Sequence, residues 1–203
     1  MNNIVVIRRV RDPFGFLGNM SPHPVYHHGE FATAEALFQA LRFPRNSQER
    51  EEIRMTRSPM AAKMHAKKNA ARMHIVPRSA NDLENMHFIL TCKVVRHADV
   101  ENGLLSTGDQ HIVEDCTARQ TESGLYWGAA LRGREWFGLN MLGVLWMEIR
   151  ERLREARQAG KVVPELGPWN TLTARELGTD MVGDTGTDMS PSIGNHSLRL
   201  KGV

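Results

Sequence analysis

The spacing of apolar residues along the chain predicts a mainly helical protein. Over residues 80–97, apolar side chains recur at positions i, i+3, i+7 and i+11, which puts them on one face of a helix. They are Leu83, Met86, Leu90 and Val94. The same signature recurs over about residues 140–157. Its members are Leu142, Leu145, Trp146, Ile149 and Leu153. We expect each segment to form a helix with one apolar face.

Three shorter helices are predicted earlier in the chain by the residues that begin them. Segments 33–43, 47–55 and 58–73 each start with a threonine or serine, whose side-chain oxygen can accept a hydrogen bond from a free N–H group of a helix start. Pro44 ends the first of these helices. Pro59 occupies a first helical position, where its missing N–H costs nothing.

β-Structure is expected only near the N-terminus. Ile4–Val10 alternates weakly and is rich in β-branched residues, which favours a short strand. Asp12–Pro24 contains two glycines and three prolines and is expected to be a loop. Val25–Phe31 carries a His-Gly turn and is typical of a hairpin. The stretch 107–138 is rich in glycine without a sustained period, so we expect it to be irregular.

A change in composition divides the chain near Gly160. Residues 161–203 are rich in Gly, Ser, Thr and Asp and show no sustained apolar period. Such a segment cannot bury enough apolar surface to form a core, so we expect an extended or flexible tail. The sequence therefore predicts a single compact, mainly α domain over residues 1–160, with a short strand and a hairpin near its N-terminus.

Composition narrows the class of protein. Hydrophobic residues make up 41% of the 203 residues and charged residues 24%, which is typical of a globular domain and not of a disordered chain. No apolar stretch reaches the ~20 residues that span a bilayer. The order of apolar and basic residues at the N-terminus is wrong for a secretory signal. We therefore expect a cytoplasmic protein without a membrane partner.

Net charge and cysteine content give no support to two further classes. A net charge of +3 is too small to indicate nucleic-acid binding, because proteins of that class usually carry a larger excess. Cys92 and Cys116 lie far apart, and neither belongs to a CxxC pair of a zinc or redox site. Two reduced, half-buried thiols are the preferred interpretation, and one long-range disulfide is the alternative.

Common chemical signatures are missing from the chain. GxGxxG, GxxxxGK[ST], HExxH and GxSxG do not occur. His27 and His28 are adjacent, and neighbours in a strand point to opposite faces, so we expect a hairpin role and no metal site. No cofactor is expected either. A basic run is either a solvated helical face or an anion site for phosphates, which Lys and Arg both suit. Its members are Arg50, Arg54, Arg57, Lys63, Lys67, Lys68 and Arg72.

Six segments form a series when they are taken in chain order. They are FGFLGNMSPHPV at 14–25, TAEALFQALRF at 33–43, SPMAAK at 58–63, TGDQHIVE at 107–114, YWG at 126–128 and GLNMLGVLWMEIRERL at 138–153. In order and spacing the series resembles the YbiA-like N-glycosidase family, also called NADAR domains. The resemblance covers about residues 14–155 and implies a mainly α fold.

The resemblance also implies an activity. Members of the family are similar in cleaving the N-glycosidic bond of a phosphorylated ribosyl or ADP-ribosyl substrate. Two substrates are implied: a ribosylamino intermediate of riboflavin synthesis, and ADP-ribose attached to guanine. In the second case ADP-ribosylated nucleic acid would be a partner.

Candidate catalytic residues follow from the motifs of this family. Breaking a ribosyl C–N bond builds positive charge at the anomeric carbon, which a carboxylate can stabilise while it activates water. Glu35 matches the glutamate of the EHxxQ motif and is the expected acid/base. Its alternative role is that of a first-turn partner of the helix dipole. Asp109 and Glu114 match the carboxylates of TGDxxLxE and either position the ribose or order their loop.

Candidate substrate-binding residues follow from the same motifs. Asn19 and Asn140 match family asparagines and either hydrogen-bond the substrate or serve turn and cap roles. Tyr126 and Trp127 either stack on a base or pack in the core. Lys63, which lies in both the SPMAAK segment and the basic run, is grouped with them as a substrate contact.

Three positions depart from the family pattern. Arg42 stands where the family has a lysine proposed to capture the opened sugar as an imine, and a guanidinium cannot replace that nucleophile. Arg42 could instead clamp a phosphate or a carboxylate, so we keep it as a candidate catalytic residue. Gly124 replaces an aspartate, and Ala36 replaces a histidine.

These departures leave two main hypotheses. The first is an N-glycosidase that uses Glu35 and water. The second is a catalytically lapsed module that binds ADP-ribose or another nucleotide. A nucleic-acid-binding protein that uses the basic helices is a third alternative.

Overall fold

The computed structural model describes residues 4–160 and the backbone of residues 200–201. Their contacts gather into two compact units, which we describe separately. Residues 9–106 form the helical unit. Residues 4–8 and the described residues from 107 onward form the split unit. The predicted tail over 161–203 lies outside the described residues, except for residues 200–201.

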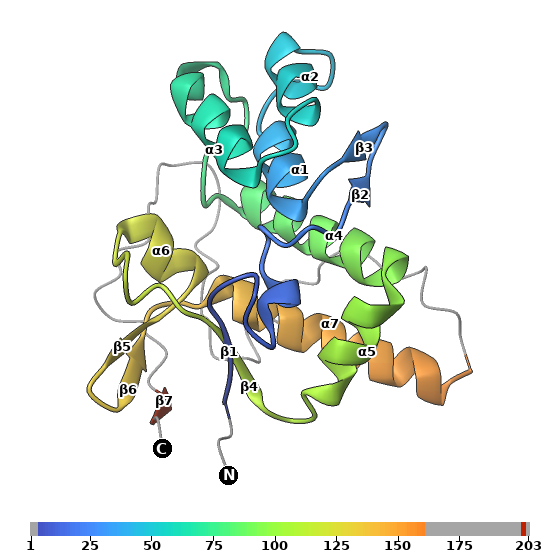
Figure 1. Ribbon diagram of the computed structural model, residues 1–203, viewed down its shortest axis with the longest axis vertical. Coiled ribbons are helices and arrows are strands. Elements are labelled where there is room, and N and C mark those ends of the chain that lie inside the picture. Colours follow the sequence, from blue (N-terminus) through green and yellow to red (C-terminus); the bar gives the residue numbers. More distant parts are fainter. Residues whose placement is uncertain (1–3, 161–199, 202–203) are drawn as a thin grey trace. The chain divides into compact units, whose positions relative to one another are not determined.

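The helical unit is arranged around α1, which packs against α2, α3 and α4 (Figure 1). Its elements are η1 (Gly15–Leu17), β2 (Val25–Tyr26), β3 (Glu30–Phe31), α1 (Ala34–Leu41), α2 (Gln48–Arg54), α3 (Pro59–Lys68), η2 (Ala70–Arg72), α4 (Ala80–Arg96) and α5 (Ala98–Ser106). The side chains of Thr33, Ser47 and Ser58 each accept a hydrogen bond from the backbone N–H three residues further on. The three predicted helix starts are therefore confirmed.

The core of the helical unit includes the apolar stripe predicted over residues 80–97 together with apolar residues of α1. Buried side chains of α1 and α4 include Leu37, Phe38, Leu41, Met86, Leu90 and Val94. The predicted hairpin is also confirmed, since β2 and β3 pair antiparallel with Val25 opposite Phe31. α5, which begins directly after His97, was not predicted from the sequence.

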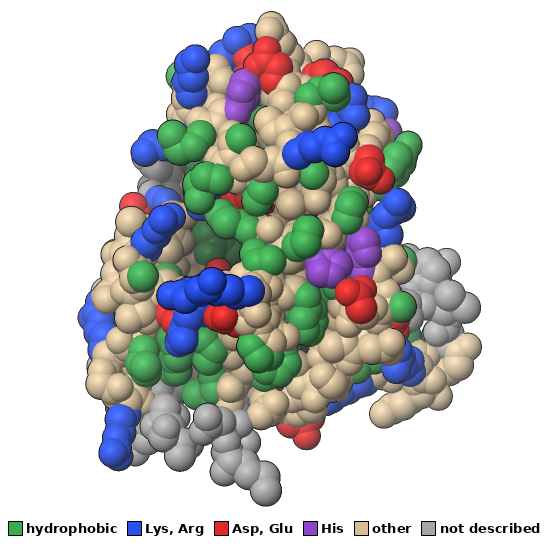
Figure 2. Space-filling view, in the orientation of Figure 1, with side chains coloured by type: hydrophobic (Ala, Val, Ile, Leu, Met, Phe, Trp, Pro, Cys, Tyr) green, Lys and Arg blue, Asp and Glu red, His purple; other side chains and the backbone are tan. Residues whose placement is uncertain are grey.

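The basic run of the helical unit does not form one continuous patch. Figure 2 shows Lys and Arg side chains over the region of α1–α3, separated by acidic and apolar side chains. Arg57, Lys63, Lys67 and Lys68 are exposed, as a solvated face requires. Arg72 is ion-paired with the buried carboxylate of Glu49. The two remaining members, on α2, have a different setting that is described below.

The split unit combines a parallel strand pair with α7. Its elements are β1 (Ile4–Ile7), β4 (His111–Glu114), α6 (Glu122–Trp127), β5 (Ala130–Arg132), β6 (Glu135–Phe137), α7 (Met141–Gln158) and β7 (Leu200–Lys201). β1 and β4 run parallel with Ile4 opposite His111, and α7 packs on β4. β5, β6 and β7 form an antiparallel sheet. The core of this unit includes the buried side chains of Val5, Ile7, Ile112, Trp146 and Ile149.

The stretch 107–138 differs from its prediction. It was expected to be irregular, yet it contains β4, α6, β5 and β6. β4 has only four residues, and its hydrogen-bonding partner β1 lies far away in sequence, near the N-terminus. Strands this short gain their stability from the partner strand and from the helix on one face, so their own residues carry little signal.

Neither of the two cysteines forms a disulfide. Cys92 and Cys116 are free, half-buried thiols, which confirms the preferred interpretation. Burial raises the pKa of both thiols, that of Cys116 to about 11.

Among the described residues, no helix combines the length and the apolar character that crossing a bilayer requires.

Candidate active site

A buried polar network runs along one face of α1. Glu35, Gln39 and Arg42 are spaced at i, i+4 and i+7 and are 6%, 4% and 8% exposed. The amide Nε2 of Gln39 donates to Oε1 of Glu35 over 2.8 Å. The amide oxygen of Gln39 accepts from Nη1 of Arg42 over 3.1 Å. The Gln39 amide is therefore held at both ends and keeps the Glu35 carboxylate in one position.

Asp82 completes this network from α4. Its Oδ1 and Oδ2 accept from Nε and Nη2 of Arg42 over 2.8 and 2.7 Å, and the Asp82 side chain is fully buried. Such a bidentate pair fixes the plane of the guanidinium. The guanidinium also lies over the Phe38 ring, 4.3 Å from its centroid. The Arg42 guanidinium is therefore already bound to Asp82 and Gln39, so few of its N–H groups remain for the predicted clamping of a phosphate.

Asn19 meets the network at the start of α1. Its backbone carbonyl accepts from the Glu35 N–H over 2.9 Å. Its side-chain Nδ2 contacts the Met86 sulfur at 3.3 Å, whereas Oδ1 is buried and has no hydrogen-bond partner among the described residues. A buried acceptor without a donor is costly. Asn19 is thus fixed beside the start of α1, and its role as a substrate contact stays a prediction.

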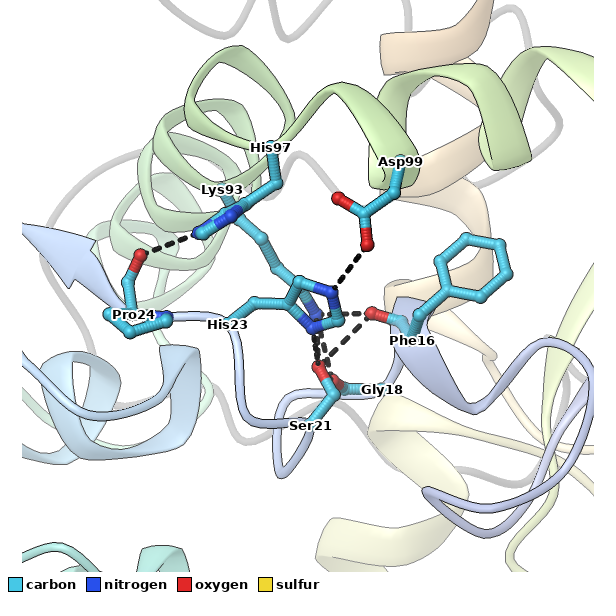
Figure 3. Close-up of polar contacts among 8 residues, drawn as sticks. All are labelled: Phe16, Gly18, Ser21, His23, Pro24, Lys93, His97 and Asp99. Atoms are coloured by element: carbon cyan, nitrogen blue, oxygen red, sulfur yellow. Dashed lines mark hydrogen bonds and ion pairs between the residues drawn. The ribbon is translucent and has the colours of Figure 1, made fainter.

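Lys93 anchors the loop that carries Asn19. Its side chain is fully buried on α4, and its Nζ reaches into the loop between η1 and β2 (Figure 3). Nζ donates to the carbonyls of Phe16 and Gly18 over 2.5 and 2.9 Å and to the Ser21 hydroxyl over 2.7 Å. Three acceptors around one ammonium compensate its burial. Lys93 was not among the functional residues predicted from the sequence.

Two histidine contacts hold the far end of the same loop (Figure 3). The His23 ring bonds to Oδ2 of Asp99 over 3.1 Å, and this hydrogen bond lowers the pKa of the Asp99 carboxyl. Nε2 of His97 bonds to the Pro24 carbonyl over 2.7 Å. The ends of α4 and α5 therefore fix the loop that sequence analysis expected to be without regular structure.

Lys63 lies apart from this network. It is exposed on α3, and no contact among the described residues connects it to Glu35. Its expected role as a substrate contact therefore gains no support from the geometry of the helical unit.

In the split unit, Asn140 connects α7 to β4. Its Oδ1 accepts from the Glu114 N–H over 2.9 Å, and its Nδ2 donates to the Ile112 carbonyl over 2.7 Å. Asn140 is fully buried and has a left-handed backbone with φ of 54°. Both ends of its amide serve the backbone of β4, so the geometry favours its turn role over substrate contact.

Asp109 lies in a turn that α7 also holds. The Asp109 side chain is 95% exposed and its Oδ1 pairs with Nη1 of Arg154 over 2.8 Å. The buried Arg150 donates from Nη1 to the Thr107 hydroxyl and to the Gln110 carbonyl, each over 2.8 Å. These contacts favour the loop-ordering alternative for Asp109.

The aromatic pair of the YWG segment ends α6. Tyr126 is buried, Trp127 is half-buried, and their rings meet edge to face at 4.9 Å. A Cβ on Gly128 would lie 2.3 Å from the Glu114 carbonyl oxygen, so only glycine permits this approach of α6 to β4. Burial of Tyr126 favours its core alternative, whereas Trp127 keeps an exposed surface.

Gly124 cannot be changed to the family's aspartate without cost. A Cβ at Gly124 would lie 2.5 Å from the Arg119 carbonyl oxygen. We therefore expect Gly124→Asp to destabilise the protein by about 1–3 kcal/mol, the usual cost of overpacking. Chemical denaturation measures the effect, and Ser123→Asp is the exposed neighbour that serves as control. Equal stability of Gly124→Asp and wild type would show that α6 tolerates a side chain here.

The orientation expected for His27 and His28 is wrong. Their rings do not point to opposite faces of a strand, and the two ring centroids lie only 4.5 Å apart. The reason is the turn of the hairpin, where His28 has a φ of 53° and Gly29 a φ of 134°. Among the described residues, no group of three or more potential ligands could hold a metal ion.

The chain is similar to proteins of known family. The sequence profile of the NADAR domain matches residues 7–154. N-glycosidase YbiA of Escherichia coli (strain K12) is 31% identical over 153 residues, which cover 75% of this chain and 89% of that protein. The Zea mays protein named riboflavin biosynthesis protein PYRR, chloroplastic, is 30% identical over 165 residues, or 74% of this chain and 25% of that protein.

A solved structure matches as well. The NMR structure of E. coli YbiA superposes with a TM-score of 0.61 at 30% sequence identity, covering 78% of this chain and 89% of that one. The mainly helical character expected from the resemblance is thereby confirmed, and the chain belongs to the NADAR domain family.

Proposed function

We propose that the chain is an N-glycosidase that hydrolyses the bond between the ribose and the base of a phosphorylated ribosyl conjugate. The relatives named as N-glycosidases support the reaction, and the name of the Zea mays relative supports a riboflavin-pathway ribosylamino substrate. ADP-ribosyl-guanine, free or in nucleic acid, is a second substrate of the same class. The observation that carries the proposal is the buried Glu35 carboxylate, which Gln39 holds through a single oxygen.

Glu35 has the surroundings that a general base needs. Its Oε1 accepts from Gln39, whereas no hydrogen bond or ion pair among the described residues involves Oε2. That oxygen can take a proton from water as the water attacks the anomeric carbon, and the carboxylate charge stabilises the oxocarbenium-like transition state. Asn19, whose backbone carbonyl accepts from the Glu35 N–H, is the proposed contact of the ribose.

Arg42 favours a direct attack by water. Its guanidinium stays protonated and is already bound to Asp82 through Nε and Nη2, so it cannot form an imine with the sugar. We therefore assign Arg42 as a positioning residue. It acts on Glu35 through the Gln39 amide, whose oxygen it holds.

The proposal is tested with the full chain and two substrates. We expect release of free base or amine, detected by mass spectrometry, from a ribosylamino-pyrimidine phosphate or from ADP-ribosyl-guanine. Borohydride added during turnover should trap no sugar on the protein, because no lysine imine forms. A borohydride-reduced adduct would contradict the water route, and absence of product from both substrates would contradict the N-glycosidase itself.

A non-catalytic binding module is the second candidate. It is favoured by the presence of a paired arginine at the position of the family's lysine. This candidate predicts that calorimetry detects binding of ADP-ribose while neither substrate is turned over. Turnover by the wild-type chain would exclude it.

A further inference from the structure

The helical unit has a pocket of about 330 Å³, lined by the turn of the β2–β3 hairpin and by the segment from the end of α1 into α2. This volume lies in the lower part of the range of small-molecule pockets, about 300–1,000 Å³. Its lining includes Arg45, Arg50, Arg54, His27 and His28, with Glu51 as its single carboxylate. It contains no member of the network of Glu35, and the activity proposed above does not require it.

The single carboxylate of the lining is already neutralised. Arg54 donates from Nε and Nη2 to the two oxygens of Glu51 over 2.7 and 2.5 Å. This hydrogen bonding lowers the pKa of Glu51, which remains ionised at neutral pH. The charges of Arg45 and Arg50 are therefore left without a counter-ion among the lining residues.

Arg50 lacks a partner where it is buried. Its Nη2 is shielded from solvent and has no hydrogen-bond partner among the described residues. Burial and the neighbouring Arg45 lower the pKa of Arg50, because both disfavour its charge. Arg50 also lines the pocket, where its guanidinium is a charge-assisted donor that suits an anion.

The hairpin turn adds a histidine donor to the arginines. Nη2 of Arg45 lies 3.1 Å from Nδ1 of His28. A guanidinium can only donate, so Nδ1 of His28 accepts and its proton resides on Nε2. Gly29 allows Arg54 to approach the turn, since a Cβ there would lie 3.0 Å from Cδ of Arg54.

His27 reports the positive potential of the pocket. Its pKa is lowered, first by burial and then by Arg50, His28 and Arg45. Burial is the main cause, and the positive charges of Arg50 and Arg45 add to it in disfavouring the protonated form of His27.

We propose that this pocket binds a phosphate monoester or inorganic phosphate as a dianion. Arg45, Arg50 and His28 offer N–H donors from two separate elements, the α2 side and the hairpin, which suits a tetrahedral anion with several oxygens. The ligand chemistry is the same whether the phosphate belongs to the substrate or is free.

The test is a titration of the full chain with inorganic phosphate, ribose 5-phosphate and ribose, followed by calorimetry and by histidine-ring NMR. We expect the two phosphates to bind and ribose not to bind. Bound phosphate should raise the pKa of His27. Arg45→Gln should weaken phosphate binding about tenfold or more, as expected for a lost charge-assisted contact. Arg57→Gln, an exposed arginine outside the lining, is the matched control and should bind as wild type does.

Several results would overturn the proposal. The first is that Arg57→Gln weakens phosphate binding as much as Arg45→Gln does. The second is that neither Arg45→Gln nor Arg50→Gln changes the affinity for phosphate. The third is that chloride at the same concentration displaces phosphate. Because binding is measured without turnover, Glu35→Gln should retain it, and a failure here is distinct from a failure of the proposed activity. The source of the phosphate follows from kinetics. A higher KM of Arg45→Gln for the phosphorylated substrate identifies the substrate's phosphate, and an unchanged KM with lost phosphate binding identifies free phosphate.

Discussion

Glu35→Gln is expected to lower kcat/KM by about 10²–10⁴-fold, the usual contribution of a positioned acid/base. Glutamine has the same shape and keeps the oxygen that accepts from Gln39, so the network should stay in place. It cannot take a proton from water and carries no negative charge to stabilise the cationic sugar. Steady-state kinetics on the cleaved substrate measures the loss, and the melting temperature reports whether the fold is retained.

Glu84→Gln is the matched control for this experiment. Glu84 is an exposed glutamate of α4 in the same unit, outside the network, and its replacement should leave the rate unchanged. If Glu35→Gln kept more than half of the wild-type kcat/KM with a normal melting temperature, Glu35 would not be the acid/base.

Asp82→Asn should cause the largest loss of stability, about 3–5 kcal/mol, because removal of one partner of a buried ion pair leaves the other charge uncompensated. Asp82 is fully buried, and both of its oxygens accept from Arg42. Asparagine fits the same space but turns N–H groups or a neutral oxygen toward the guanidinium. Urea unfolding followed by circular dichroism measures the free energy of unfolding.

A double variant distinguishes the interaction between Arg42 and Asp82 from the contacts that each residue makes with the rest of the protein. Arg42→Gln combined with Asp82→Asn removes both charges, so its cost should be smaller than the sum of the two single effects. Asp109→Asn, at an exposed ion pair of the other unit, should change stability little. Strictly additive losses would mean that Arg42 and Asp82 do not stabilise each other.

The helix starts could be predicted because their signals are local. Thr33, Ser47 and Ser58 each bind a backbone N–H three residues away, so a few residues decide where the helix begins. The glutamate at the start of α1 was found only through the motif, since an acidic residue in a first turn is equally typical of a simple dipole partner.

β1 lies within the strand predicted over Ile4–Val10, but the other strands of the split unit could not be predicted in the same way. β4 pairs with β1, and β5 pairs with β6, in stretches of three or four residues. Strands this short are too brief to show a sustained alternation. β4 in addition depends on the distant β1 and on α7, which its own residues do not reveal.

Buried charges were missed for a related reason. Asp82 and Lys93 stand in the first and last turns of α4, where charged residues normally complement the helix dipole in solvent. The signal that could have identified them is their spacing, since both share the apolar face with Met86. A charge in an apolar stripe implies a partner, but the sequence does not say which residue that partner is.

The pairing of β1 with β4 sets an order for the folding of this chain. The helical unit is a continuous segment, whereas the split unit takes its first strand from before that segment and the rest from after it. During synthesis the helical unit can fold as soon as it has been made, because its internal contacts join only residues that are already present. β1 must wait for β4 as an unpaired apolar strand throughout that time. Contacts of such high sequence separation form slowly, so assembly of the split unit should be the late step in folding.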